Sequence, residues 1–285
     1  MVLSMQNRES GKTAQPRPKV FRALGKADPP EQAEIDGHPY RRIDILKHDS
    51  WAATALYQGP RGMVVAKFNR QQSVFGLPMK WLGRRLARRE TFMLQRLDDL
   101  PNIPDYSGNL TINGVSQRHA VTHDYVAGHP LERREPVNDA FFSTLQQLIK
   151  DMHARDLAYV DLSKRQNIIV GDDDKPYLID FQISLNLPAW WPGSGWPMRA
   201  VLRLLQGMDD YHVLKHYRDC RPDLLSPEQL DLERYRPWTI RFGRRIGKPL
   251  REMRRKFLVF IGVRTGKGRA QSETAPEDAV RREME

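Results

Sequence analysis

The stretch YVDLSKRQNIIV at residues 159–170, together with YLIDFQ at residues 177–182, decides the predicted fold. NIIV and YLID are apolar runs joined by the polar residues GDDDKP, a pattern that predicts a β-hairpin. Pairing of the two runs brings Asn167 and Asp180 toward one point. Asp161 stands six residues before Asn167. The sequence therefore predicts that two carboxylates and one amide gather beside a hairpin.

Such a set of side chains suits phosphoryl transfer, which needs a cation on the phosphates, a metal ion held by oxygen ligands, and a base near the acceptor hydroxyl. Mg²⁺ takes few protein ligands, all of them oxygen. Lys67, in the strand pattern MVVAKF, is the candidate cation. Glu90, in the helix pattern LARRETFML, is its candidate partner in a charge-assisted pair.

Two textures divide the chain between its polar ends. Strand patterns dominate from Tyr40 to about Val126 and are interrupted by one helix over residues 82–97, whose apolar side is expected to include Phe92. Helical patterns dominate from about Asn138, where Asn or Asp is the expected helix cap. We expect a mobile arm at 1–33, a β-rich lobe at 34–126, an α-rich lobe with basic C-terminal helices at 127–263, and a disordered tail at 264–285.

The residues VVAKF, RRETFML, MHARDLAYVDLSKRQNIIV and LIDFQ, taken in this order, resemble the motifs of the protein-kinase-like superfamily. The resemblance covers about Tyr40 to Tyr217. Within the superfamily, these residues look most like the atypical RIO-type and lipopolysaccharide-kinase-like branch. The resemblance implies an α+β, two-lobed protein-kinase-like fold that uses ATP and Mg²⁺.

The same resemblance implies a role for each candidate residue. It makes Asp161 the base, and it makes Asn167 and Asp180 the metal ligands. Lys67 and Glu90 become the phosphate-binding pair. One further acid, Asp209 or Asp210, is expected to brace the catalytic loop.

Near the expected nucleotide site, one part of the family pattern is replaced and another is only approximately matched. The glycine-rich turn is replaced by LKHDSWAATALY, where Ser50, Ala52 and Ala53 are small enough for backbone amides to approach a phosphate. HDYVAGHPL, with Asp124 and Tyr125, resembles the hinge beside the adenine.

The catalytic loop and the metal motif are altered as well. Because the Asp-to-Asn spacing is one residue longer than usual, we expect a bulge within SKRQ, with Gln166 as the alternative metal-facing amide. Lys164 or Arg165 in that bulge is placed to meet the transferred phosphate. Gln182 replaces the usual glycine of the metal motif.

The charge distribution bears on the partners of the protein. The net charge is +11, and residues 234–269 hold thirteen Lys or Arg against one acid. This favours polyanions such as a glycolipid or an anionic membrane surface, although an ordinary solvated face remains the alternative. Trp190, Trp191 and Trp196 either plug a core or form an aromatic platform.

The remaining signals concern metal binding and location. His212 and His216, four residues apart, favour a structural role over metal binding. The single Cys220 and the absence of a long apolar run indicate a cytoplasmic protein. The basic segment and the tryptophan loop add the hypothesis that it is peripheral at the inner membrane face.

The function expected from these patterns is phosphate transfer from ATP to a hydroxyl of a glycolipid, lipopolysaccharide-type or other sugar acceptor. A protein serine/threonine kinase is the alternative with the same chemistry. A pseudokinase that binds nucleotide or partners is the alternative of another class. Nucleic-acid binding rests on charge alone and ranks last. The oligomeric state is open.

Overall fold

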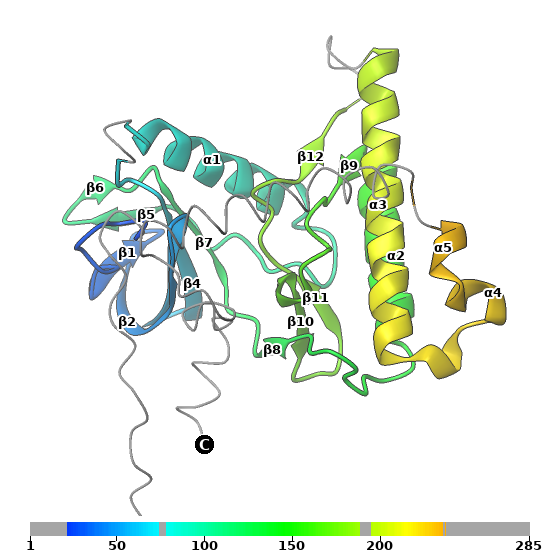
Figure 1. The fold of residues 1–285 in the computed structure, drawn as a ribbon. Coiled ribbons are helices and arrows are strands. Elements are labelled where there is room, and N and C mark those ends of the chain that lie inside the picture. Colours follow the sequence, from blue (N-terminus) through cyan, green and yellow to red (C-terminus); the bar gives the residue numbers. More distant parts are fainter. Residues whose placement is uncertain (1–21, 74–77, 189–194, 236, 238–285) are drawn as a thin grey trace, which may run out of the picture.

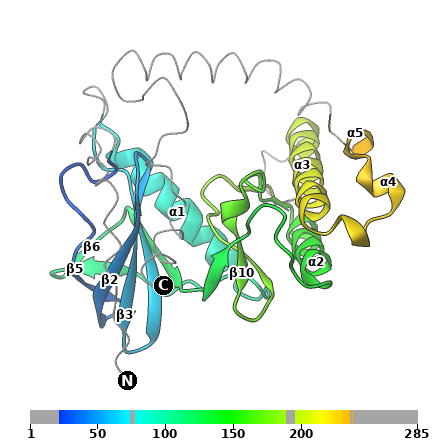
Figure 2. The same cartoon turned by 60° about the horizontal axis from the view of Figure 1, so that its bottom comes forward.

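The computed structural model describes residues 22–73, 78–188, 195–235 and 237. They form two lobes, a β lobe with one long helix and a lobe in which helices α2 and α3 lie side by side (Figures 1 and 2). The predicted α+β, two-lobed arrangement is therefore confirmed. The chain passes from one lobe to the other between Asp124 and Gly128.

The β lobe is a seven-stranded antiparallel sheet in the order β6-β5-β1-β2-β3-β4-β7. Its strands are β1 Gln32–Ile35, β2 His38–His48, β3 Ala52–Gly59, β4 Gly62–Asn69, β5 Leu110–Ile112, β6 Val115–Ser116 and β7 Ala120–Asp124. β4 lies between β3 and β7, and its residues 64–69 are all buried. Lys67 stands opposite Thr54 on β3 and Val121 on β7. A lysine in such a buried position needs anionic partners.

Helix α1, Lys80–Arg96, packs on β4 and β7. Its buried side is formed by Gly83, Ala87, Glu90, Met93 and Leu94. Gly83 is required because a Cβ there would lie 2.2 Å from the carbonyl oxygen of Arg70. The close approach of helix and strand places Glu90 beside Lys67. Phe92 is half exposed, so the expectation that it lies on the apolar side of the helix is wrong.

The second lobe contains two short sheets, β11-β10-β8 and β12-β9, beside its helices. Its elements are β8 Gly128–Pro130, α2 Phe141–Ala154, β9 Leu157–Ala158, a 3₁₀ turn at Arg165–Asn167, β10 Ile168–Gly171, β11 Pro176–Leu178, β12 Leu185–Asn186, α3 Trp196–Cys220, a 3₁₀ turn at Pro222–Leu224, α4 Pro227–Leu230 and α5 Leu232–Tyr235. β10 pairs with β11 from Ile168↔Leu178 to Val170↔Pro176, which confirms the predicted hairpin. A continuous core joins α1, α2 and this hairpin.

Three details differ from the expectations. Part of the expected mobile arm, residues 22–33, packs on the β lobe: Ala23 is buried, its amide donates to Asp49 O at 2.7 Å, and β1 begins at Gln32. Helix α2 starts after Ala140, and no side chain caps it. Trp196 begins α3 and is 82% exposed, so it plugs no core.

Several expectations fall outside the described residues. These are Trp190 and Trp191, nearly all of the basic segment 234–269, and the terminal stretches 1–21 and 264–285. None of the helices among the described residues combines the length and the hydropathy needed to cross a bilayer.

Candidate active site

Asp161 and Asn167 lie at the two ends of a tight loop and are both buried. The loop turns twice, with the Lys164 amide donating to Asp161 O and the Asn167 amide donating to Lys164 O, each at 3.2 Å. The Asn167 side chain donates to Asp161 O at 3.3 Å. Gln166 is exposed to solvent. The extra residue is therefore absorbed before Asn167, as predicted, and Gln166 is excluded as the inward-facing amide.

Asp180 reaches the same place through the hairpin. β10 and β11 are in register, and the Ile179 amide donates to Asn167 O at 3.1 Å. The next residue, Asp180, has a left-handed backbone with φ of 64°. This conformation is uncommon for a residue other than glycine, and it is often found at functional sites.

Lys67 joins the two lobes. Its Nζ lies 3.1 Å from Glu90 Oε1 on α1 and 2.8 Å from Asp180 Oδ1. Burial opposes the charge of Lys67, but the carboxylates of Asp180 and Glu90 outweigh it and raise the pKa of the ammonium. Burial likewise opposes ionisation of Asp180, yet Lys67 lowers the pKa of that carboxyl. The three groups form one charged cluster at the boundary of the lobes.

Asp209 on α3 braces the loop that bears Asp161. Its carboxylate is fully buried and accepts hydrogen bonds from the amides of Tyr159 at 2.7 Å and Val160 at 2.8 Å. Asp210, the alternative brace, is exposed instead and lies 3.9 Å from His153. Val160 has a φ of 73°, which is a strained value for a β-branched residue. The two hydrogen bonds stabilise this conformation one residue before Asp161.

A later turn of α3 adds a second support. His216 Nε2 donates to Leu162 O at 2.7 Å, so the backbone on the other side of Asp161 is also held. Burial lowers the pKa of His216 to about 4, which keeps the ring neutral at neutral pH. The structural role expected for this histidine is therefore what the geometry shows.

The two basic residues of the loop point to different partners. Lys164 is mostly exposed, and its Nζ lies 2.6 Å from Asp161 Oδ2. Arg165 faces Asp219 on α3, with its Nη1 3.8 Å from Oδ2. Of the two residues left open by the sequence, Lys164 is the one beside the candidate base.

Two contacts between the lobes go beyond the sequence predictions. The Gln182 side chain donates to Asn69 Oδ1 on β4, and Arg89 Nε on α1 donates to Ser184 O at 2.9 Å. Both fix the segment after Asp180 against the β lobe. In the sequence, only the replacement of the usual glycine by Gln182 pointed to such a contact. The long amide side chain can reach the β lobe, which glycine cannot do.

The turn between β2 and β3 differs from its expected form. Asp49 Oδ1 accepts hydrogen bonds from the amides of Trp51 at 2.7 Å and Ala52 at 3.0 Å. Arg70 donates to Ser50 O. The Ala52 amide is therefore occupied by a carboxylate of the same turn. That the small residues of this turn let backbone amides approach a phosphate stays a prediction. A role of Ser50 in nucleotide binding stays a prediction.

Asp124 and Tyr125 lie at the end of β7, where the chain leaves the β lobe. The Asp124 amide donates to Asp105 O at 2.9 Å, and the Tyr125 amide donates to Met63 O at 3.1 Å. Gly128 follows with a φ of 146°, and a Cβ there would lie 2.1 Å from the carbonyl oxygen of Val170. The connection thus runs tightly between the lobes, in the position of a hinge.

The donor set at the loop and hairpin fits a magnesium ion. Among the described residues no group of three or more His, Cys, Asp or Glu side chains gathers as a metal cluster. Mg²⁺ does not need one, because it is usually held by one or two carboxylates together with substrate phosphates and water. Asn167 and Asp180 supply an amide oxygen and a carboxylate at the same open end of the β10–β11 hairpin.

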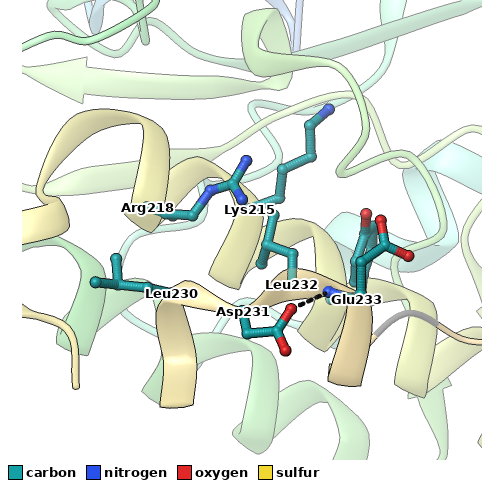
Figure 3. A pocket seen from close by; sticks show the side chains of 7 residues that line it. Lys215, Arg218, Leu230, Asp231, Leu232 and Glu233 are labelled. Carbon is teal, nitrogen blue, oxygen red and sulfur yellow. Dashed lines mark hydrogen bonds between the residues drawn. The ribbon is translucent and has the colours of Figure 1, made fainter. Parts of the chain in front are cut away.

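A cavity of about 160 Å³ lies elsewhere in the second lobe, between α3 and α5 (Figure 3). Lys215 and Arg218 line it from α3, and Asp231 and Glu233 line it from the opposite side. The nearby Tyr211 belongs to a small apolar cluster that is separate from the core under Asp161. None of the predicted site residues borders this cavity.

The sheet with its single helix, the hinge and the braced loop beside a hairpin define a protein-kinase-like fold. No family model and no curated protein matches the sequence. Among solved structures, the chain is similar to the Rio2 kinase of Chaetomium thermophilum, in a complex with ADP, Mg²⁺ and phosphoaspartate, with 17% identity and a TM-score of 0.43. The match covers 65% of this chain and 58% of that one, which is less than two thirds of its length.

Proposed function

We propose that this protein is an ATP- and Mg²⁺-dependent phosphotransferase. The observation that carries the proposal is the cluster in which Lys67 contacts both Glu90 and Asp180 at the lobe boundary, beside the braced loop that bears Asp161. A lysine with a purely structural role needs only one counter-ion. Lys67 instead contacts one carboxylate from each lobe, at the boundary that a nucleotide would bridge. Positioning and electrostatic stabilisation account for nearly all of phosphoryl transfer catalysis.

Each residue of the site has a role in this proposal. Asp161 orients the acceptor hydroxyl and takes its proton as the oxygen attacks the γ-phosphorus and ADP leaves. Lys67, steadied by Glu90, neutralises the nucleotide phosphates, and Lys164 meets the transferred group. Asn167 and Asp180 hold Mg²⁺, which supplies further charge neutralisation when bound.

The acceptor in this proposal is a hydroxyl of a glycolipid or other sugar, in line with the lipopolysaccharide-kinase-like branch that the motifs resemble. The exposed Trp196 at the start of α3 supports it, because indole favours both sugar rings and membrane interfaces. The basic segment 234–269 supports a cytoplasmic protein that works at the inner membrane face. A protein serine or threonine is the alternative acceptor.

A pseudokinase is the second candidate, and the turn at Asp49 favours it. A carboxylate that already uses the amides of Trp51 and Ala52 places negative charge where a phosphate-binding turn is expected. In this reading the charged cluster binds nucleotide, or stabilises the lobe boundary, without turnover.

The deciding experiment is an ATP-hydrolysis and phosphotransfer assay with Mg²⁺, in which the wild type is compared with Asp161→Ala and Asp180→Ala. The proposal expects activity in the wild type alone, with nucleotide binding retained by Asp161→Ala. Equal, near-zero activity in all three proteins, with nucleotide still bound, supports the pseudokinase instead.

A further inference from the structure

The solvent side of α1 is strongly cationic. The helix holds six Lys or Arg and a single acid, Glu90, which is buried against Lys67. Four of the cations recur with two exposed aromatic rings, Trp81 at 60% and Phe92 at 50% exposure, along one side of the helix. We call this set the α1 face; its members are Lys80, Trp81, Arg84, Arg85, Arg88 and Phe92. It is basic and aromatic at helical spacing.

The cations of the α1 face are not used within the described part of the chain. No described carboxylate forms an ion pair with Lys80, Arg84, Arg85 or Arg88, whereas Arg89, which points inward, is used by Ser184 O. The next acids along the chain, Asp98 and Asp99, lie beyond the end of the helix, and Asp99 is paired with Arg155. Within the described ranges, the α1 face therefore carries positive charge that no carboxylate pairs with.

An exposed apolar group on α3 continues this surface. Ser184, held by Arg89, follows the exposed Ile183, and Leu187 then packs on Leu202 of α3. The N-terminal turns of α3 expose Trp196, Met198 and Val201. In Figure 1, α1 and the N-terminal end of α3 both reach the upper side of the molecule. Described contacts thus connect the two groups through the segment that follows Asp180.

We propose that the α1 face, together with Ile183 and the exposed apolar residues of α3, docks on an anionic membrane surface. Lys and Arg near such a surface are attracted to lipid phosphates, and Trp and Phe favour the headgroup level. The aliphatic Ile183, Met198 and Val201 fit insertion between lipids but offer no ring on which a nucleic-acid base can stack. A lipid surface therefore fits the whole set better than RNA does.

Docking in this way does not depend on phosphotransfer, so it can be tested in the absence of ATP. It sets at the membrane the segment that directly follows Asp180 of the candidate active site. The proposal is separate from the basic segment 234–269, which offers another route to the same lipids.

The test is co-sedimentation of the full chain with vesicles of phosphatidylcholine, with and without phosphatidylglycerol. The test variant is Arg84→Glu/Arg85→Glu/Arg88→Glu. The matched control, Arg41→Glu/Arg133→Glu/Lys150→Glu, changes three exposed cations away from the α1 face by the same charge. Circular dichroism checks that both variants fold, and Asp161→Asn checks that binding does not need the candidate base.

The expected result is at least tenfold weaker binding of the α1 variant to the anionic vesicles, with the control close to wild type. Trp81→Ser/Phe92→Ser is expected to weaken the binding that persists at high salt. If the α1 variant and the control lost vesicle binding equally, the loss would come from the change in net charge alone, and this result would overturn the proposal. So would an unchanged α1 variant, or a wild type that binds an RNA oligonucleotide through these arginines and leaves the vesicles unbound.

Discussion

Lys67 lies closer to Asp180 than to Glu90: its Nζ is 2.8 Å from Asp180 Oδ1 and 3.1 Å from Glu90 Oε1. The lysine thus ties the hairpin of one lobe to the sheet of the other, and α1 joins through Glu90. A single ammonium compensates two buried or partly buried carboxylates. The stability of the lobe boundary and the proposed chemistry consequently depend on the same side chain.

Replacing Lys67 with methionine should destabilise the protein by about 3 kcal/mol, because it leaves Glu90 buried without a counter-ion. Glu90→Gln in the same background should recover part of that loss. Urea unfolding of the two single variants and the double variant measures the coupling. If Lys67→Met unfolded with the same urea midpoint as the wild type, the result would contradict a stabilising contact between Lys67 and the buried Glu90.

Replacing Asn167 with alanine should weaken Mg²⁺-dependent ADP binding by about tenfold or more, since ligands and their supporting groups at metal sites typically have effects of this size. The neighbouring Gln166→Ala is the matched control and should bind like the wild type, because Gln166 is exposed to solvent. Calorimetric titration with ADP, with and without Mg²⁺, makes the comparison. The reverse order of the two variants would show that the loop takes the other register.

Lys164→Ala should lower kcat by about a hundredfold, a loss typical of removing one group that stabilises transition-state charge. ADP affinity should change little. Arg165→Ala removes the same charge from the next residue, but Arg165 faces Asp219 and should keep most of the activity. Steady-state kinetics of both variants decides, and equal losses would remove the special role of Lys164.

The free energy of unfolding should fall as the pH drops from about 6.5 toward 4. Burial lowers the pKa values of His119, His123 and His216 from 6.5 to about 4, so in this window the unfolded chain binds protons that the folded chain does not. Each such group costs about 1.4 kcal/mol per pH unit. His216→Gln, which retains a donor for Leu162 O, should show a shallower slope in denaturation series across pH. A slope equal to that of the wild type would mean that His216 is protonated in the folded protein.

Local patterns were enough to predict the hairpin and the loop. The runs NIIV and YLID have one natural pairing, and that pairing leaves only the segment before Asn167 to absorb the extra residue. Lys67 and Glu90 were found because strand alternation and charge pairing both constrain them. These parts of the site depend on neighbours in sequence or on strong electrostatic demands.

Contacts set by tertiary packing were not predictable in the same way. Whether Asp209 or Asp210 faces the loop depends on how α3 is rotated about its own axis. Two adjacent acids in the sequence do not reveal that rotation. The carboxylate of Asp49 accepts hydrogen bonds from two amides of its own turn. This turn conformation could not be predicted from the small residues around Asp49. The burial of Ala23 requires the β2–β3 turn to exist first. Each of these depends on an element placed elsewhere in the fold.

The brace between Asp209 and the amides of Tyr159 and Val160 also constrains the order in which the protein can assemble. The carboxylate comes 49 and 50 residues after the amides that it holds. The left-handed Val160 costs about 1–3 kcal/mol without support. Until α3 has docked, the loop that bears Asp161 therefore lacks the two hydrogen bonds that stabilise its final shape. During synthesis from the N-terminus, the strands of the β lobe are complete well before Asp209 is added.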